Sequence, residues 1–450
     1  MTRVLVLANE HVNQKMAGPS IRSFELSRAL HDAGHTVTLG SPFVSDLERA
    51  QFDIVTYDES TLPAQVAVSD VVVLQGWVME RFPWIRDQPA RVVVDLYDPF
   101  PLEVIVLFER YSMDKRWETH ADAVRAVNDQ VRRGDFFMCA SEKQLDYWSG
   151  WLTAAGRFNP LTYASDPSLR ELLDVVPFGL PSAPPVRARH AVRDTFAGID
   201  AGDFVLLWGG GVYNWFDPVT LIRAVALASR AHPALRLVFM STGHPNPDIQ
   251  SRWTLADARR VADELGLTGR TVFFNDSWVE YEQRGDWLLD ADVGVSTHFD
   301  HVETRFSFRT RILDYFWAGL PVISTEGDTL AEAIASKELG ITVPPEDVEA
   351  CASAIHRLSS DRVFRSDCAQ RVRSHARSLT WSTVAEPLIR YCDGAQPAAD
   401  RRGDTPASLR GEPGSPTHAS TASAAVPSTP LHLLRRAYSR ALRSARMRSE

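Results

Sequence analysis

The sequence is poor in cysteine and has no long apolar run. It contains only four scattered cysteines, with no Cys-x-x-Cys pair: Cys139, Cys351, Cys368 and Cys392. This pattern argues against a disulfide framework and against a zinc site. No run approaches the roughly 18 apolar residues that a membrane-spanning helix needs, and no apolar leader segment follows the first strand-like residues. We therefore expect a cytoplasmic protein.

The chain also lacks a net positive charge. The formal net charge is −9 over 450 residues, which argues against nucleic acid as the main partner because a polyanionic backbone would repel the protein. The hydrophobic fraction of 44% and the charged fraction of 23% are those of an ordinary globular protein with ample core. The length predicts two to three domains.

Short apolar runs alternate with amphipathic stretches along most of the chain. In the first part, residues 4–8, 71–74 and 91–98 have the composition of buried strands, with helical patterns between them. The alternation stops at residues 175–185, "VVPFGLPSAPP", whose four prolines predict a stiff connector. It then restarts and continues to about residue 343. The pattern predicts two α/β domains of similar size, each with a parallel sheet.

These boundaries give a first domain over residues 1–180 and a second over residues 186–377. A helix over residues 378–393 is expected to close the structure.

The last part of the chain has a different composition. Residues 394–430 are rich in Ala, Pro, Ser, Thr and Gly and almost lack large apolar side chains, which predicts a disordered linker. Residues 431–450 carry six arginines against one acid, and their apolar side chains fall on one helical face. This pattern predicts a basic amphipathic helix that binds anionic membrane surfaces. Docking on the acidic body of the same protein is the alternative.

The most unusual stretch, "TRFSFRTRILDYFWAGLPVIST" at residues 304–325, sets Arg305, Arg309 and Arg311 before an apolar element. Guanidinium groups are planar, bidentate donors that suit phosphate oxygens. A solvated helix face is the alternative. Asp314 follows among apolar neighbours, where ribose hydroxyls would be suitable partners. An ion pair with Arg311 is the alternative for Asp314.

Two glycine loops precede predicted helices. Gly18 lies in "KMAGPSIRS", where a helix N-terminus could cradle a phosphate. Gly209, Gly210 and Gly211 follow a buried strand, and glycine allows the backbone to come close to a ligand. These glycines form neither a P-loop nor a dinucleotide fingerprint. A purely local turn is the alternative in both loops.

Polar side chains also follow predicted strands in each domain. A loop in the second domain carries four of them: His298, Asp300, His301 and Glu303. Their spacing matches no standard zinc pattern, so recognition of substrate hydroxyls is preferred over metal binding. Tyr97 and Asp98 end a strand of the first domain, and ligands bind at the carboxyl ends of such strands. Capping of the next helix is the alternative for these two residues.

Together these features resemble the GT-B glycosyltransferases, specifically the retaining family 4. The segment "ILDYFWAGLPVIST" is similar to the family motif "LEAMACGLPVV-x-T". The segment "GPSIRSFELSRALHDAGHTVTL" is similar to the family's opening glycine loop, helix and strand. The resemblance covers about residues 4–392. It implies the GT-B fold, with two Rossmann-like domains whose parallel sheets face each other across a cleft.

The resemblance also implies roles for individual residues. The second acid of the family's Glu-x7-Glu signature matches Asp314, which would bind the ribose. The first acid would fall on Phe306, so Glu303 is expected to contact the donor sugar instead.

Other positions depart from the family pattern. The usual diphosphate-binding Arg and Lys are replaced, because the matching stretch contains Gly211 and Phe216. The three arginines of residues 304–325, Arg309 first among them, are therefore expected to bind the diphosphate and stabilise it as it departs, with the N–H groups of the glycine loops. His298 is expected to bind hydroxyls of the donor. The family's His-Asp pair becomes Tyr97–Asp98, which would orient the reacting groups.

The implied activity is transfer of a sugar from a nucleoside diphosphate donor to a glycan or lipid-linked acceptor, as in the synthesis of cell-surface polysaccharides or glycoconjugates. Retention of configuration is implied, with no metal or other cofactor. The protein would be cytoplasmic, with its tail at the inner face of the membrane. Two alternatives stay open: a GT-B sugar-nucleotide epimerase, and a non-catalytic protein that binds carbohydrate or a partner.

Overall fold

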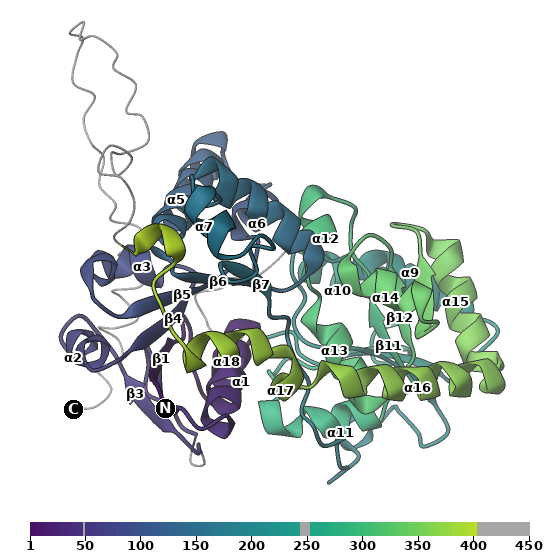
Figure 1. Ribbon diagram of the computed structural model, residues 1–450. Coiled ribbons are helices and arrows are strands. Elements are labelled where there is room, and N and C mark those ends of the chain that lie inside the picture. Colours follow the sequence, from purple (N-terminus) through teal and green to yellow (C-terminus); the bar gives the residue numbers. More distant parts are fainter. Residues whose placement is uncertain (48–49, 244–252, 403–450) are drawn as a thin grey trace, which may run out of the picture.

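The computed structural model describes residues 1–47, 50–243 and 253–402. Within this part of the chain, strands form two parallel sheets, one in each half (Figure 1). The first has seven strands in the order β3-β2-β1-β4-β5-β6-β7, and the second has six in the order β10-β9-β8-β11-β12-β13. The prediction of two α/β domains with parallel sheets is confirmed.

The strands are short, as is usual for buried parallel sheets. The first sheet comprises β1 (Arg3–Leu7), β2 (Thr36–Ser41), β3 (Asp53–Thr56), β4 (Val71–Gln75), β5 (Arg91–Asp95), β6 (Phe136–Cys139) and β7 (Leu173–Val175). The second comprises β8 (Phe204–Trp208), β9 (Leu235–Phe239), β10 (Val272–Phe274), β11 (Val293–Ser296), β12 (Val322–Thr325) and β13 (Gly340–Val343).

Helices cover both faces of each sheet. Those of the first domain are α1 (Gly18–Asp32), α2 (Leu62–Ala67), α3 (Val78–Arg81), α4 (Phe100–Leu107), α5 (Met113–Arg133), α6 (Glu142–Ala154) and α7 (Pro160–Ser165). Those of the second are α8 (Ala191–Thr195), α9 (Pro218–Ala228), α10 (Trp253–Glu264), α11 (Arg284–Leu289), α12 (Val302–Phe306), α13 (Thr310–Ala318), α14 (Thr329–Ser336), α15 (Val348–Ser360) and α16 (Arg362–Ala376).

The apolar strand sequences follow from burial on both faces. In β1, Val4 and Val6 belong to a core with α1, whereas Leu5 and Leu7 belong to a core with α3, α5 and α6 on the other face. The core on the α1 side continues into the second domain, where it includes Val205 and residues of α13. One apolar core is therefore shared by the two domains, while the opposite face of each sheet has a core of its own.

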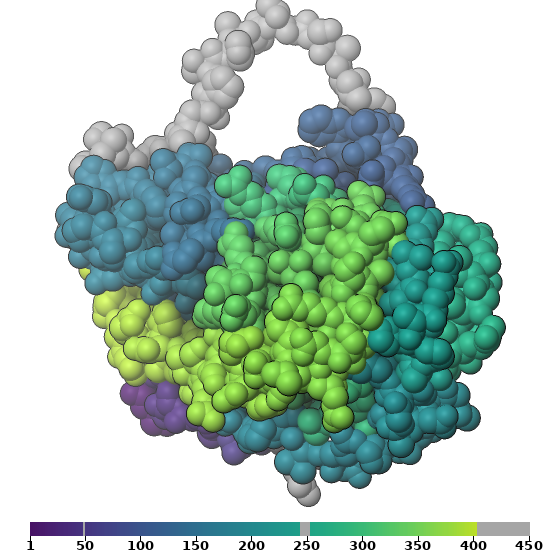
Figure 2. Space-filling view, turned by 90° about the vertical axis from the view of Figure 1, so that its right-hand side faces the viewer, coloured from purple at the N-terminus to yellow at the C-terminus, as the bar shows by residue number. Residues whose placement is uncertain are grey.

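The chain crosses between the domains twice. After β7 it enters the second domain, and after α16 it returns through α17 (Trp381–Val384) and α18 (Glu386–Asp393). The two crossings contact each other, because Leu180 N–H donates to Leu379 O at 2.7 Å and Trp381 N–H donates to Leu180 O at 3.0 Å. A Cβ on Gly179 would lie 2.7 Å from Trp381 Cα, so only glycine fits this contact. Figure 2 shows the returning segment, in yellow-green, passing from the second domain onto the first.

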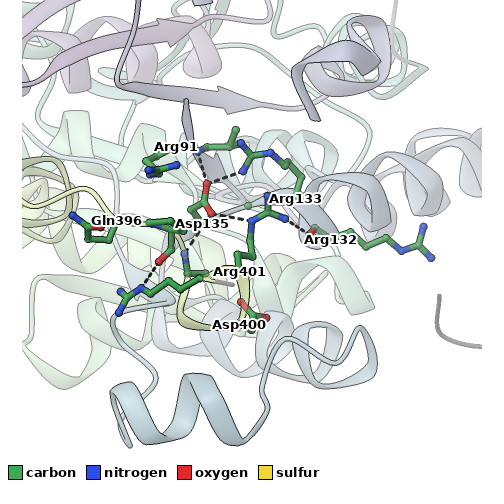
Figure 3. Close-up of polar contacts among 12 residues, drawn as sticks. Arg91, Arg132, Arg133, Asp135, Gln396, Asp400 and Arg401 are labelled. Atoms are coloured by element: carbon green, nitrogen blue, oxygen red, sulfur yellow. Dashed lines mark hydrogen bonds and ion pairs between the residues drawn. The ribbon is translucent and has the colours of Figure 1, made fainter. Parts of the chain in front are cut away.

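Residues 394–402 differ from the prediction of a disordered linker over 394–430. Arg157 and Asp400 form an ion pair at 2.7 Å. Arg401 donates to Asp135 at 3.0 Å (Figure 3). Ala398 is only 7% exposed. Since the charged side chains here pair with buried groups of the first domain, the prediction of disorder is wrong for residues 394–402.

The rest of the predicted linker and the predicted basic helix over residues 431–450 lie outside the described residues. Among the helices of the described part, none is long and apolar enough to cross a membrane.

Candidate functional site

A cleft of about 500 Å³ lies between the two domains. It is lined by the loops that follow β1, β4 and β5 in the first domain and β8 in the second, together with α4 and the start of α13. In each sheet the strand order reverses at the first strand of the domain, since β1 lies between β2 and β4 and β8 lies between β9 and β11. Crevices that bind ligands form at the carboxyl ends of the strands at such a switch point. Ten predicted site residues line this cleft: Gly18, Tyr97, Asp98, Gly209, Gly210, Gly211, Glu303, Arg309, Arg311 and Asp314.

Arg305 and His298 are not among the described residues that line the cleft, so their predicted role in donor binding has no support from this geometry and stays a prediction. Arg305 is exposed, with its guanidinium 5.6 Å from the ring centre of Phe306. Glu303 and Arg305 are two residues apart on the short helix α12, so they point in nearly opposite directions and only Glu303 faces the cleft. His298 is fully buried at the end of β11, where Nε2 lies 3.4 Å from Asp328 Oδ2.

The glycine loop after β8 lets the backbone pass close to α13. Gly210 has a φ of 68°, which favours glycine. A Cβ on Gly209 would lie 3.2 Å from the ring of Tyr315. The Gly209 N–H donates to the Tyr315 hydroxyl at 2.7 Å, and that hydroxyl donates to Val295 O at 2.8 Å. Because Tyr315 takes the Gly209 N–H, only the N–H groups of Gly210 and Gly211 could serve a ligand.

Arg311 has no carboxylate partner among the described residues. Its Nη2 donates to Gly211 O at 2.5 Å, and its guanidinium lies 3.8 Å from the ring centre of Phe216. Nη1 is buried and has no hydrogen-bond partner in the described part of the protein. Burial, with the charge of Arg309 nearby, lowers the pKa of Arg311 to about 10, so the group is cationic at neutral pH. A buried guanidinium without a counter-ion is unusual and suits an anionic ligand.

Arg309 is held by Glu303 instead of facing the cleft unpaired. Nη1 and Nη2 of Arg309 donate to the two carboxylate oxygens of Glu303 at 3.0 and 2.7 Å. Both side chains are at most 5% exposed. The predicted role of Arg309 as stabiliser of a leaving diphosphate is therefore less direct, since its charge is already balanced, and its observed contact positions Glu303.

Asp314 pairs with Arg284. The ion pair with Arg311, which was the alternative to ribose binding, is not formed. Arg284 Nε donates to Asp314 Oδ1 at 3.1 Å, and the guanidinium lies 3.6 Å from the ring centre of Tyr281. The Asp314 side chain is 34% exposed, so part of it reaches the cleft. Arg284 was missed because it lies 30 residues earlier in the chain, on another helix. No local pattern links the two positions.

In the first domain, Asp98 and Tyr97 face the cleft from the end of β5. Burial raises the pKa of Asp98 to about 7, and the charge of Asp95 adds to this rise. A hydrogen bond from the Tyr97 hydroxyl opposes it. Asp95 itself is held by Arg22, whose Nε and Nη2 lie 2.6 and 2.9 Å from its oxygens.

Glu103 is a cleft residue that the sequence reasoning missed. It lies in the first turn of α4 and lines the cleft. Burial raises the pKa of Glu103 well above its usual range, and the charges of Asp98 and Glu303 add to the effect. Its signal was present in the sequence, since it is the one acid in the apolar segment "FPLEVIVL".

Comparisons with known proteins agree with this geometry. Residues 203–361 match the family model described as glycosyl transferases group 1. Curated relatives include the D-inositol 3-phosphate glycosyltransferase of Thermomonospora curvata, 27% identical over 201 residues that cover 44% of each chain. Another is the protein of that name from Saccharomonospora viridis, 28% identical over 210 residues that cover 45% of each chain. The match thus spans less than half the length of these relatives.

Solved structures extend the likeness to most of the chain. Sucrose-phosphate synthase from Thermosynechococcus elongatus superposes with a TM-score of 0.63 at 18% identity, covering 88% of this chain and 100% of the other. HepE from Anabaena, in complex with UDP and glucose, gives 0.63 at 15% identity with the same coverage. The chain therefore has the GT-B fold of two facing α/β domains. The match to group 1 glycosyl transferases lies within the second domain, at residues 203–361.

Proposed function

We propose that this protein is a hexosyltransferase that moves a sugar from a nucleoside diphosphate donor to an acceptor hydroxyl. Retention of configuration and independence from metal, as in the retaining family 4, are part of the proposal. The acceptor would be a glycan or a lipid-linked sugar in the synthesis of surface polysaccharides or glycoconjugates. The reaction would take place in the cytoplasm. The family match and the UDP complexes of structural neighbours support the donor class.

The observation that carries the proposal is the state of Arg311. Three arginines line the cleft, and two of them are matched by acids, Arg284 by Asp314 and Arg309 by Glu303. Arg311 has no acid partner among the described residues, and it borders the glycine loop. A diphosphate would supply the missing negative charge.

Each step then has a side chain suited to it. Charge that develops on the departing diphosphate would be stabilised by Arg311, by N–H groups of the glycine loop and by the N-terminus of α1 at Gly18, because such preorganised groups act most strongly in a water-poor site. Glu303, held by Arg309, would orient the donor sugar. Asp314 would accept hydrogen bonds from the ribose.

The first domain would present the acceptor. Asp98 lies across the cleft from Glu303 and accepts a hydrogen bond from Tyr97. A half-buried carboxyl with a pKa near 7 can accept a proton from a reacting hydroxyl or donate a hydrogen bond to it. Tyr97 would keep this carboxyl in position.

The test is a panel of nucleoside diphosphate sugars, assayed with and without mixed glycan and lipid-linked acceptors. The proposal predicts nucleotide release that depends on the acceptor and a glycosylated product. Nucleotide release without acceptor, together with an isomerised sugar, would instead mark an epimerase. Failure of every donor to raise the melting temperature would favour a non-catalytic protein.

A further inference from the structure

The two walls of the cleft differ in charge. All three arginines that line it, Arg284, Arg309 and Arg311, belong to the second domain. Among the described lining residues, the first domain contributes no lysine, arginine or histidine. It contributes four acids instead: Glu10, Asp95, Asp98 and Glu103.

Two of these acids, Asp98 and Glu103, have no ion-pair partner in the described part of the chain, because the nearest arginines, Arg22 and Arg309, are paired with other acids. Asp95 is matched by Arg22, which lies behind it and is fully buried. By contrast, no basic side chain of the described part forms an ion pair with Asp98 or Glu103. The lowered acidity of both carboxyls has the same origin, since burial comes first among its causes and neighbouring carboxylates add to it. The first-domain wall is thus negative or neutral, depending on pH.

The same wall offers apolar surface next to the acids. The rings of Trp77 and Phe100 lie 5.4 Å apart at an angle of 49°, and both residues line the cleft. Val104 and Leu107 of α4 extend this surface. Aromatic and aliphatic side chains of this kind pack against the apolar faces of ligands, while carboxyl groups beside them bind hydroxyls.

We propose that the acceptor is an uncharged molecule that presents hydroxyls beside an apolar group, and that the first-domain wall excludes phosphorylated acceptors. The term acceptor rests on the proposed function, but the electrostatic selection does not. A phosphate carries roughly two negative charges at neutral pH. On this wall it would face Asp98 and Glu103 with no cation to pair with it, and like charges in a partly buried site repel strongly. The curated relatives, by contrast, are named for inositol 3-phosphate.

Matched ligands test this selection. With UDP present in excess to occupy the donor side, the affinities of glucose, glucose 6-phosphate and octyl glucoside (below its micelle concentration) are measured by calorimetry. We expect octyl glucoside to bind at least about tenfold more tightly than glucose 6-phosphate. Equal or tighter binding of glucose 6-phosphate would overturn the proposal, as would the absence of measurable binding by octyl glucoside.

Charge reversal supplies a matched control. Glu103→Arg places a cation on the wall and should narrow the preference for octyl glucoside over glucose 6-phosphate by about tenfold. Glu109→Arg makes the same change at an exposed residue that does not line the cleft and should leave the preference unchanged. Glu103→Gln removes the charge with little change in side-chain size, so it guards against misfolding of Glu103→Arg. It should also narrow the preference for octyl glucoside over glucose 6-phosphate, but by less than Glu103→Arg does.

Binding of UDP on the donor side is measured separately. Binding of UDP by the wild-type protein tests the proposed function. If UDP does not bind, the comparison of Glu103→Arg with Glu109→Arg still tests the selection against phosphorylated ligands. An unchanged preference in a Glu103→Arg protein with a native melting temperature would refute the selection, whatever UDP does.

Discussion

At the scale of single residues, the partners of the cleft arginines decide what each charge can do. Arg309 is neutralised by Glu303 and Arg284 by Asp314, whereas Arg311 keeps its charge for a ligand. The sequence predicted that Arg305, Arg309 and Arg311 serve an anion, but it could not show that Arg311 is the one without an acid partner among the described residues. That distinction depends on ion pairs and on which face of a short helix each side chain takes, as the outward position of Arg305 illustrates.

Asp314→Ala should weaken binding of the nucleotide sugar by about 10- to 150-fold, because hydrogen bonds to a charged acceptor contribute roughly 1.5–3 kcal/mol. The protein should also melt earlier, since Arg284 would lose its partner in a site where it is 8% exposed. Calorimetry and thermal melting measure the two effects. Asp300→Ala, in an exposed loop residue nearby, is the control and should change neither. Normal donor affinity in Asp314→Ala would show that Asp314 does not bind the donor and serves only as the ion-pair partner of Arg284.

The raised pKa of Asp98 predicts a pH-dependent stability. Because burial raises this pKa to about 7 from an unfolded value near 3.9, folding favours the protonated form. The contribution of Asp98 to stability is therefore full below about pH 4, declines as pH rises towards 7 and levels off above it. Denaturant unfolding of wild type and Asp98→Asn from pH 4 to pH 8 measures this. The difference between the two proteins should change across that window in favour of the Asn variant; a constant difference would contradict the assignment.

At the scale of elements, the alternation of apolar and amphipathic segments was enough to predict the parallel sheets. It was not enough to predict breaks within a segment. Residues 378–393 were expected to form one helix, yet they form α17 and α18, with Pro387 in the first turn of α18. Residues 394–402 were expected to be disordered because they almost lack large apolar side chains, but their ion pairs are made with residues more than 200 positions away. Composition carries no information on such distant partners.

The segment 394–402 should therefore contribute to stability. Asp400→Ala removes the partner of Arg157, whose side chain is 6% exposed. Breaking a buried ion pair by removing one member typically costs about 3–5 kcal/mol, and backbone acceptors at Val131 and Gly134 will reduce that cost here. We expect a loss of about 2 kcal/mol in the free energy of unfolding. Asp367→Ala, at an exposed position, should change it little; equal effects in the two variants would show that the segment is only loosely attached.

At the scale of the whole molecule, contacts on both sides of the cleft hold the domains together. Tyr281 of the second domain donates to Glu25 of the first at 3.0 Å. On the other side, Gln144 Nε2 donates to Phe306 O at 2.8 Å. The arrangement of two domains about a cleft was predictable from the repeated pattern and the proline-rich connector. The contacts across the cleft were not, because each joins side chains from distant elements.

The basic sequence of residues 431–450 predicts reversible binding to anionic membranes, which would bring the cleft to lipid-linked acceptors. Each arginine near an anionic surface contributes roughly 1 kcal/mol. Sedimentation with anionic vesicles should therefore fall sharply when the six arginines of this segment are replaced by glutamine. Neutral vesicles serve as the control. Equal sedimentation of the two proteins at low salt, or none by either, would instead favour docking of this segment on the protein's own acidic body.

The central claim is that Arg311 binds the donor diphosphate, and the most direct test compares the affinities for UDP and uridine. Arg311→Gln should weaken UDP binding by about 10- to 150-fold, the loss expected for a charged hydrogen bond. Its affinity for uridine, which lacks the diphosphate, should not change. Arg305→Gln makes the same substitution outside the cleft and should leave both affinities intact. Wild-type affinity for UDP in Arg311→Gln would contradict the account.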